Sequence, residues 1–156
     1  MTASGVWIGV DPGAVRVGVA ASDPEAVLAV PVETVARGRG DVGRICSIAI
    51  ERKAVGILVG LPRALSGAEG ASAARAREFA RELALRSPAP VRMVDERLTT
   101  VTATRDLQAS GRSSRQSRPV VDQVAATVLL QAALDRMSST GSPVGELVSG
   151  TAEVEQ

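Results

Sequence analysis

Short apolar stretches that alternate with stretches of helical period constrain the fold of this chain more than any other feature. The apolar run at residues 6–10 leads into a turn at residues 11–13, which is typical of a buried strand. Residues 16–20 alternate between polar and apolar and predict a second strand, antiparallel to the first. Residues 27–35 predict a third strand, and Pro31 within it indicates a sheet edge, because proline cannot donate a ladder hydrogen bond.

The following part of the chain alternates helix and strand. Helical spacing of apolar residues predicts a helix over 41–52, and the continuous apolar run at 55–59 predicts a strand buried on both faces. Ser66 and Glu69 have the spacing of a capping box, which predicts that a helix begins there and extends to about residue 86. Further elements are expected in this order: a strand at 91–94, a helix at 100–109 and a long helix at 119–137.

These elements predict one α/β domain over residues 1–137. Its sheet is expected to be mixed and five-stranded, with an antiparallel meander of the first three strands and with the strands at 55–59 and 91–94 parallel to the first. A chain of 156 residues suffices for one such core. Residues 138–156 contain Ser, Thr, Gly, Pro and three Glu without an apolar period, so they predict a flexible or disordered tail.

The composition excludes several kinds of chemistry. The chain has no His, so Ser-His-Asp catalysis, Cys-His catalysis and imidazole metal ligands are excluded. Trp7 and Phe79 are its only aromatic residues, too few for the stacking platforms of single-strand binders. The lone Cys46 excludes an internal disulfide framework and is expected to be a small core residue; a disulfide across a dimer would require it to be exposed.

Charge and hydropathy predict a soluble cytoplasmic protein. The chain begins with no basic and apolar leader and has no apolar run of about 18 residues, so we expect no membrane partner. Residues 1–137 hold 18 basic and 14 acidic groups, a net charge of +4, because the remaining three acids lie in the tail. An enzyme of this composition depends on carboxylates, hydroxyls, Arg and any metal that they hold.

Acidic residues follow two of the predicted strands. Asp11 lies at the carboxyl end of the first strand, and Asp95 and Glu96 lie at the carboxyl end of the fifth, where ligands bind in open α/β sheets. Asp122 flanks the apolar stripe of the last helix. Such a set of oxygen ligands suits Mg²⁺ or Mn²⁺, which can activate water for phosphodiester hydrolysis. This hypothesis requires Asp11, Glu96 and Asp122 to lie close enough to share an ion.

Each of these acids also has a simpler interpretation. Asp11 before Pro-Gly is a common turn residue. Asp95 and Glu96 could cap the next helix or pair with Arg97. The helix dipole favours Asp122 in a first helical turn. The metal hypothesis therefore depends on the combination of these residues.

Arginines near these acids are candidates for nucleic-acid binding. The segment 111–118 carries Arg112, Arg115 and Arg118 without an acid, which indicates either a solvated loop or a clamp for the phosphate backbone. Arg16 and Arg63 could reach substrate phosphates.

Four motifs resemble those of the YqgF/RuvX family. Residues 11–23 (DPGAVRVGVAASD) are similar to its opening motif, and Gly60-Leu61-Pro62 with Gly67 is similar to its second. Residues 95–100 (DERLTT) resemble its most diagnostic stretch, and residues 121–126 (VDQVAA) its last. The motifs occur in order over about residues 5–137. One departure is Val15, where the family often has Lys, so Arg16 is the nearer basic candidate.

The resemblance implies an RNase H-like fold and a metal-dependent nuclease. Asp11, Glu96 (with Asp95 beside it) and Asp122 would be its catalytic acids. The family has been proposed to resolve Holliday junctions and, alternatively, to trim the 5′ end of precursor 16S ribosomal RNA.

The favoured hypothesis is a Mg²⁺- or Mn²⁺-dependent endonuclease that resolves four-way DNA junctions in recombination and repair. Symmetric cutting of a junction predicts a homodimer, because it needs two sites related by a two-fold axis. The alternatives are a nuclease that processes precursor 16S rRNA in ribosome biogenesis and a non-catalytic nucleic-acid-binding module. An actin-like phosphotransferase is disfavoured, because the chain is too short for two domains that clasp ATP.

Overall fold

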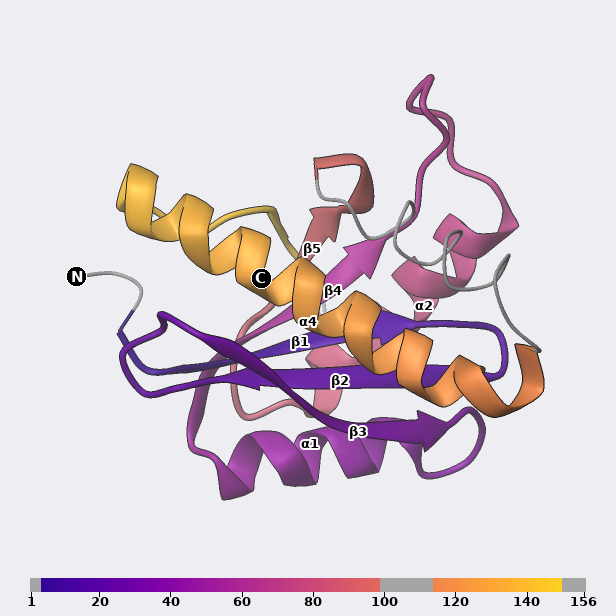
Figure 1. The fold of residues 1–156 in the computed structure, drawn as a ribbon, viewed down its shortest axis with the longest axis horizontal. Helices are drawn as coiled ribbons and strands as arrows, with labels where there is room; N and C mark the ends of the chain where they lie inside the picture. Colours follow the sequence, from indigo (N-terminus) through magenta and orange to yellow (C-terminus); the bar gives the residue numbers. More distant parts are fainter. Residues whose placement is uncertain (1–3, 99–113, 150–156) are drawn as a thin grey trace.

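A six-stranded mixed sheet forms the centre of the computed structural model, which describes residues 4–98 and 114–149 (Figure 1). The strand order is β3-β2-β1-β4-β5-β6. The strands are β1 (Val6–Pro12), β2 (Arg16–Ser22), β3 (Ala29–Ala36), β4 (Ala54–Leu61), β5 (Val91–Asp95) and β6 (Glu146–Leu147). β1, β2 and β3 form an antiparallel meander, and β4 and β5 run parallel to β1. The predicted α/β class and strand directions are confirmed, and β3 with Pro31 lies at an edge.

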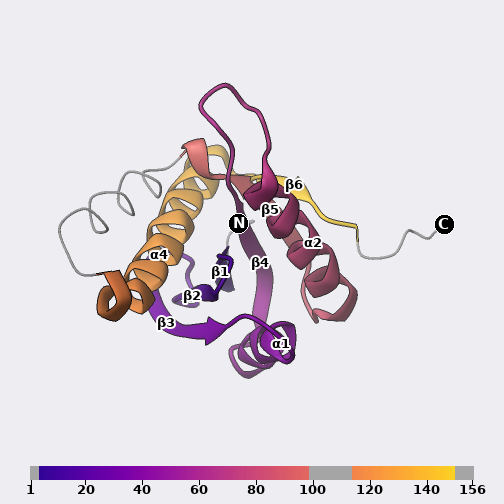
Figure 2. The ribbon, with the colours of Figure 1, turned by 90° about the vertical axis from the view of Figure 1, so that its right-hand side faces the viewer.

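Helices cover both faces of the sheet. α1 (Asp41–Glu51) and α2 (Ala71–Arg86) lie on one face, and α4 (Ser114–Thr140) crosses the other (Figure 2). The short 3₁₀ helix η1 (Glu96–Leu98) directly follows β5. α4 begins five residues before the expected helix at 119–137 and ends three residues after it. The helix expected at 100–109 lies outside the described residues.

Two apolar clusters fill the spaces between the sheet and its helices, because successive strand residues point to opposite faces. On the α1/α2 face, alternate positions of neighbouring strands present large residues. They include Ile8, Val10, Val17, Val19, Ile57 and Val59, packed against Ile45, Ile48, Phe79 and Leu83. On the α4 face, the strands present Trp7, Ala20, Leu58 and Val94, packed against Ala125, Ala126, Leu129, Leu130, Ala133, Leu134 and Met137. Cys46 is buried, as expected of a core residue.

Residues 138–149 differ from the expected tail. α4 continues to Thr140, and β6 pairs antiparallel with β5 through Met93 and Glu146. Val144 is buried, and a Cβ on Gly145 would overlap the carbonyl oxygen of Met93, so this segment packs directly on the edge of β5. These contacts stabilise a strand too short to show a period in the sequence. Residues 150–156 lie outside the described part of the chain.

The capping box expected at Ser66 and Glu69 is absent. α2 begins after Gly70, and no side chain caps it. Glu69 instead binds Arg63 and Arg77, and Ser66 Oγ accepts a hydrogen bond from the Ala68 amide within the loop. Two guanidinium partners hold the Glu69 carboxylate more strongly than a backbone amide would.

None of the helices within residues 4–98 and 114–149 combines the length and the apolar character that crossing a membrane requires.

Candidate functional site

Asp11 lies between two glycines on the α4 face of the sheet. Gly18 in β2 pairs with it directly, and the β1–β4 register, continued from Gly9–Leu58, sets Gly60 on its other side. Paired residues of neighbouring strands point to the same face, so all three positions face α4. Asp11 is only 2% exposed although its side chain is acidic. The sheet therefore presents a buried carboxylate between two strand positions that carry no side chain of their own.

Gly18 lets the backbone of α4 approach the sheet. A Cβ at this position would overlap the carbonyl oxygen of Asp122, so the helix lies directly on β2 there. Gly9 has the same role one strand away, where a Cβ would lie 2.8 Å from the Cβ of Leu130. The close approach brings Asp122 to the strand pair that carries Asp11.

Glu96 reaches the same face from the end of β5. Its side chain folds back over β4, where a Cβ on Gly60 would lie 2.7 Å from Glu96 Oε2. Glu96 is 3% exposed, so its carboxylate is as buried as that of Asp11. Asp11, Glu96 and Asp122 thus surround Gly18 and Gly60 at the carboxyl ends of β1, β4 and β5.

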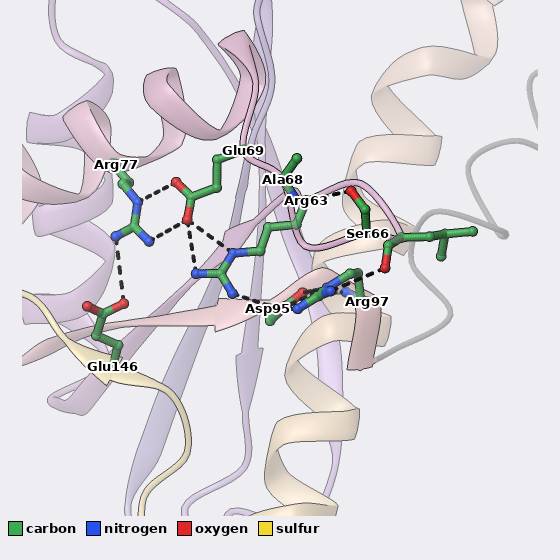
Figure 3. Close-up of polar contacts among 9 residues, drawn as sticks. Arg63, Ser66, Ala68, Glu69, Arg77, Asp95, Arg97 and Glu146 are labelled. Atoms are coloured by element: carbon green, nitrogen blue, oxygen red, sulfur yellow. Dashed lines mark hydrogen bonds and ion pairs between the residues drawn. The ribbon is translucent and has the colours of Figure 1, made fainter.

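Asp95 lies apart from these three acids. It pairs with Leu61 and comes two residues after Met93, and both of these residues lie on the α1/α2 face, so alternation directs the Asp95 side chain away from α4. Its carboxylate binds Arg97 Nη2 at 2.6 Å and Arg63 Nη1 at 3.2 Å (Figure 3). The hydrogen bonds from Arg97 lower the pKa of Asp95. Of the interpretations that the sequence left open, pairing with Arg97 describes Asp95, whereas Glu96 joins Asp11.

Arg63 and Arg97 fix the loop between β4 and α2 to the end of β5. Arg63 bridges Asp95 and Glu69, and Arg97 Nη1 donates to the carbonyl oxygen of Leu65 at 3.4 Å. Hydrogen bonds from Arg77 and Arg63 lower the pKa of Glu69 to about 2. Sequence reasoning missed this network, because its members are separated by up to 83 residues along the chain and show no common spacing.

Arg16 faces Asp122 across the α4 face. Its Nε lies 3.4 Å from Asp122 Oδ2, in an ion pair that includes no Nε hydrogen bond, and that Nε atom is buried. Both side chains are partly exposed, at 26% and 19%. Arg115 and Arg118 lie in the first two turns of α4, before Asp122, and Arg112 lies outside the described residues.

The described carboxylates do not form a preorganised metal-binding site. Within residues 4–98 and 114–149, no three Asp, Glu, Cys or His side chains are close enough to hold one ion. The close approach required of Asp11, Glu96 and Asp122 is therefore not present in this arrangement. The donor chemistry nevertheless fits Mg²⁺ or Mn²⁺, because three carboxylates share one face and two of them are buried where bulk water does not compete.

Comparison with known proteins supports a nuclease. Residues 5–136 match the family described as "RuvX: Holliday junction resolvase". A protein of Thermobifida fusca is 54% identical, covering 95% of this chain and 98% of its own, and one of Nocardioides sp. is 53% identical, covering 95% and 99%. Both carry the name "Putative pre-16S rRNA nuclease".

A solved structure shares the fold. T. thermophilus RuvC, in complex with a Holliday junction substrate, aligns with a TM-score of 0.52 over 87% of this chain and 97% of that chain. The sequences are 18% identical, so the likeness concerns the fold alone. It supports the expected RNase H-like architecture.

Proposed function

The chain belongs to the RuvX family of nucleases, and on that premise we propose that it trims the 5′ end of precursor 16S ribosomal RNA. As a nuclease it hydrolyses phosphodiester bonds. The choice of an RNA substrate is supported by relatives that are named for this reaction. These relatives are more than 50% identical to the chain over nearly the whole of both sequences. The likeness to RuvC does not favour a DNA junction, because it extends only to the fold. An rRNA substrate implies that the protein works in the cytoplasm.

Asp11, Glu96 and Asp122 are the residues that would hold Mg²⁺ or Mn²⁺. When bound, such an ion lowers the pKa of a water molecule and neutralises charge on the leaving oxygen. Strand register fixes Asp11, and the contact with Gly60 orients Glu96. Their burial strengthens the attraction of each carboxylate for a cation, because the surroundings screen charge weakly.

Arg16 would exchange partners when substrate binds. Its buried Nε makes no hydrogen bond in the free protein, although Asp122 is 3.4 Å away. A backbone phosphate offers oxygens that can satisfy the guanidinium in two-point geometry. Departure of Arg16 would remove a cation that competes with a metal ion for the Asp122 carboxylate. This exchange would explain why the three acids do not form a metal-binding group in the free protein.

Arg112, Arg115 and Arg118 would position the RNA backbone. They precede Asp122 in the chain, and the last two lie on the helix that carries it. Contacts of Arg with phosphate fix the orientation of a nucleic acid without reading its sequence. Arg63 is a weaker candidate for this role, because Glu69 and Asp95 already bind it.

The test compares labelled precursor 16S RNA, a four-way DNA junction and a plain duplex, each with Mg²⁺, Mn²⁺ or a chelator. We expect Mg²⁺-dependent cleavage at one position in the 5′ extension of the RNA. Asp11→Asn should reduce cleavage by at least about a hundredfold, the typical effect of removing one preorganised charge, and leave RNA binding intact. Asp95→Asn is the matched control and should reduce it by less than about tenfold, the low end for residues that orient others. Equal cleavage by Asp11→Asn and wild type would instead support a non-catalytic module.

Junction resolution is the second candidate, favoured by the description of the family. It requires a homodimer on the junction, because two symmetric cuts need two sites. Sedimentation of the protein on a junction that it cleaves distinguishes the two candidates. A monomer in that complex would exclude symmetric resolution.

A further inference from the structure

A pocket of about 460 Å³ lies at the edge of β5, next to the point where β6 begins. β6 pairs only with Arg92 and Met93, so the edge of β5 at Val94 and Asp95 is left to the pocket. α4 and the segment after it complete its walls. The volume lies within the range of about 300–1,000 Å³ that is usual for small-molecule sites.

The pocket adjoins the candidate active site. Leu129 of α4 packs over Gly60, where its Cδ2 would lie 3.2 Å from an added Cβ, at the same place where Glu96 rests. Ala132 and Ala133, which line the pocket, follow Leu129 by about one helical turn, or about 5 Å along the axis. An RNA strand that has one phosphate at Glu96 would therefore bring the neighbouring nucleotide to the pocket.

The walls combine an apolar floor with polar groups that are already fixed. Leu61, Val94, Ala132 and Pro143 supply aliphatic surface. Arg63, Asp95 and Glu146 also line it.

Ion pairs hold those polar groups in place (Figure 3). Arg63 Nη2 lies 2.9 Å from Glu69 Oε2, and Arg63 Nη1 lies 3.2 Å from Asp95 Oδ2. Arg77 binds both Glu69 and Glu146. With Arg97, which also binds Asp95, three guanidinium groups balance three carboxylates, so this wall offers donors and acceptors without attracting a free anion. Such a wall suits a neutral heterocycle better than a phosphate.

Arg136 supplies a cation at the mouth of the pocket. It is exposed and makes no ion pair with any residue in 4–98 or 114–149. Guanidinium planes stack on unpaired bases in RNA recognition. This stacking matters here because Trp7 and Phe79 are both buried in the core and cannot reach a base.

We propose that this pocket binds the base of an unpaired nucleotide next to the scissile phosphate, an inference that rests on the proposed RNA substrate. The base would lie on the aliphatic floor under Arg136, with its polar edge toward Asp95 and Arg63. The pocket would then select substrates with a single-stranded extension at the cleavage site over continuous duplex.

The test measures RNA affinity in chelator, so that no cleavage occurs. Precursor RNA is prepared with one abasic nucleotide at each position around the cleavage site, and binding is followed by fluorescence anisotropy. For wild type we expect one position at which loss of the base weakens binding by about tenfold, within the range for one stacked base. Ala132→Leu, which fills the pocket, should bind intact RNA about as weakly and show no further loss with that abasic RNA.

Two further variants accompany this cycle. Ala74→Leu, at an exposed position of α2, is the matched control and should behave as wild type. Arg136→Gln changes an exposed side chain, so it should remain folded, and it should weaken binding of intact RNA more than binding of the abasic RNA.

The outcomes separate the pocket from the proposed function. The pocket proposal would be overturned if Ala132→Leu bound intact RNA tightly and still lost affinity for the abasic RNA as wild type does. It would also be overturned if wild type lost no affinity at any abasic position, even if the RNA is cleaved. If Ala132→Leu abolished the loss of affinity caused by the abasic nucleotide, this result would support the pocket proposal even if no cleavage were observed. In a last arm, nucleoside 5′-monophosphates are titrated while the Ala132 methyl signal is observed by NMR. Binding of a free monophosphate as tight as that of RNA would also overturn an RNA-strand site.

Discussion

The two faces of the sheet are built from the same strands but from different residue types. On the α1/α2 face, β1 and β4 present Ile8, Val10, Ile57 and Val59, all fully buried. On the α4 face, the sheet presents glycine at three central positions of its middle strands, and α4 or an acidic side chain occupies the space above each. Large side chains keep a helix at its ordinary distance, whereas glycines let it approach. Both faces bury an apolar cluster, but the α4 face also positions the carboxylates of the candidate site.

Packing on the α4 face should therefore contribute less to the free energy of unfolding than packing on the α1/α2 face. Glycine within a strand contributes no packing and loses more chain entropy on folding. Burial of Asp11 and Glu96 opposes folding, because charged groups lose hydration there. Substitutions on the two faces should consequently separate stability from activity.

The largest effect is expected from Ile57→Ala on the α1/α2 face. Removal of a fully buried side chain leaves a cavity and should lower the free energy of unfolding by about 2–5 kcal/mol. Urea unfolding followed by circular dichroism measures this loss. The folded fraction should keep wild-type cleavage at saturating RNA. A specific loss of cleavage in fully folded protein would show that this face also serves the site.

Gly60→Ala on the α4 face should do the opposite. The new methyl would lie 2.7 Å from Glu96 Oε2, which can move away because it ends a flexible side chain. Cleavage should fall by up to about a hundredfold, the effect of displacing a reacting group by about 1 Å. The free energy of unfolding should change by less than about 1 kcal/mol.

The matched control for this variant is Gly70→Ala, since nothing lies within 4 Å of a Cβ at Gly70. Steady-state cleavage rates should match wild type there, and the free energy of unfolding should fall by about 1 kcal/mol or less, because Gly70 is the N-cap of α2 and alanine is a poorer N-cap than glycine. Unchanged cleavage by Gly60→Ala would contradict a role for the Glu96 position.

Arg16→Gln tests the partner exchange on the α4 face with a smaller expected effect. Loss of the partly exposed cation beside Asp122 should strengthen Mn²⁺ binding by about two- to fivefold, the worth of an ion pair of this kind. Affinity for RNA should fall at the same time. Free Mn²⁺, measured by electron paramagnetic resonance without nucleic acid, reports the first effect.

Arg44→Gln serves as the comparison, because Arg44 pairs with Glu33 on the edge of the sheet. It should leave Mn²⁺ affinity unchanged. Weaker Mn²⁺ binding by Arg16→Gln would rule out competition between Arg16 and the ion.

The smallest effect concerns the ion pairs around Glu69. Arg77 and Arg63 hold the pKa of Glu69 at about 2, below its ordinary 4.5. A lowered pKa means that this stabilisation is present above about pH 4.5 and is lost as the pH falls toward about 2. Glu69→Gln should therefore show a smaller fall in the urea midpoint between about pH 5 and pH 3 than wild type does. An identical fall in both proteins would assign the acid sensitivity to other groups.

The five long strands were predictable because each contains enough apolar residues to show its period. β6 was not, because Glu146 and Leu147 form a strand only through the packing of Gly145 on Met93. The capping box at Ser66 failed for a related reason, since Arg63 and Arg77 engage Glu69 from distant parts of the chain. Contacts between distant residues leave no periodic trace.

The sequence identified which acidic residues belong to the candidate site, but their positions relative to one another could not be predicted from it. The sequence placed Asp11 and Glu96 at strand ends, and it left Asp95 and Glu96 equivalent. Alternation along β5, together with Gly60, separates those two neighbours onto different faces. The ion pair of Arg16 with Asp122 depends on where α4 crosses β2, which no local pattern encodes.

Pro31 has a consequence for how the protein behaves at high concentration. It lies in the outermost strand on one side of the sheet, and it removes an amide hydrogen that an incoming strand would need. On the opposite side, β6 exposes a ladder only two residues long. Neither border offers a long uninterrupted template for strand addition, so the protein should resist edge-to-edge aggregation.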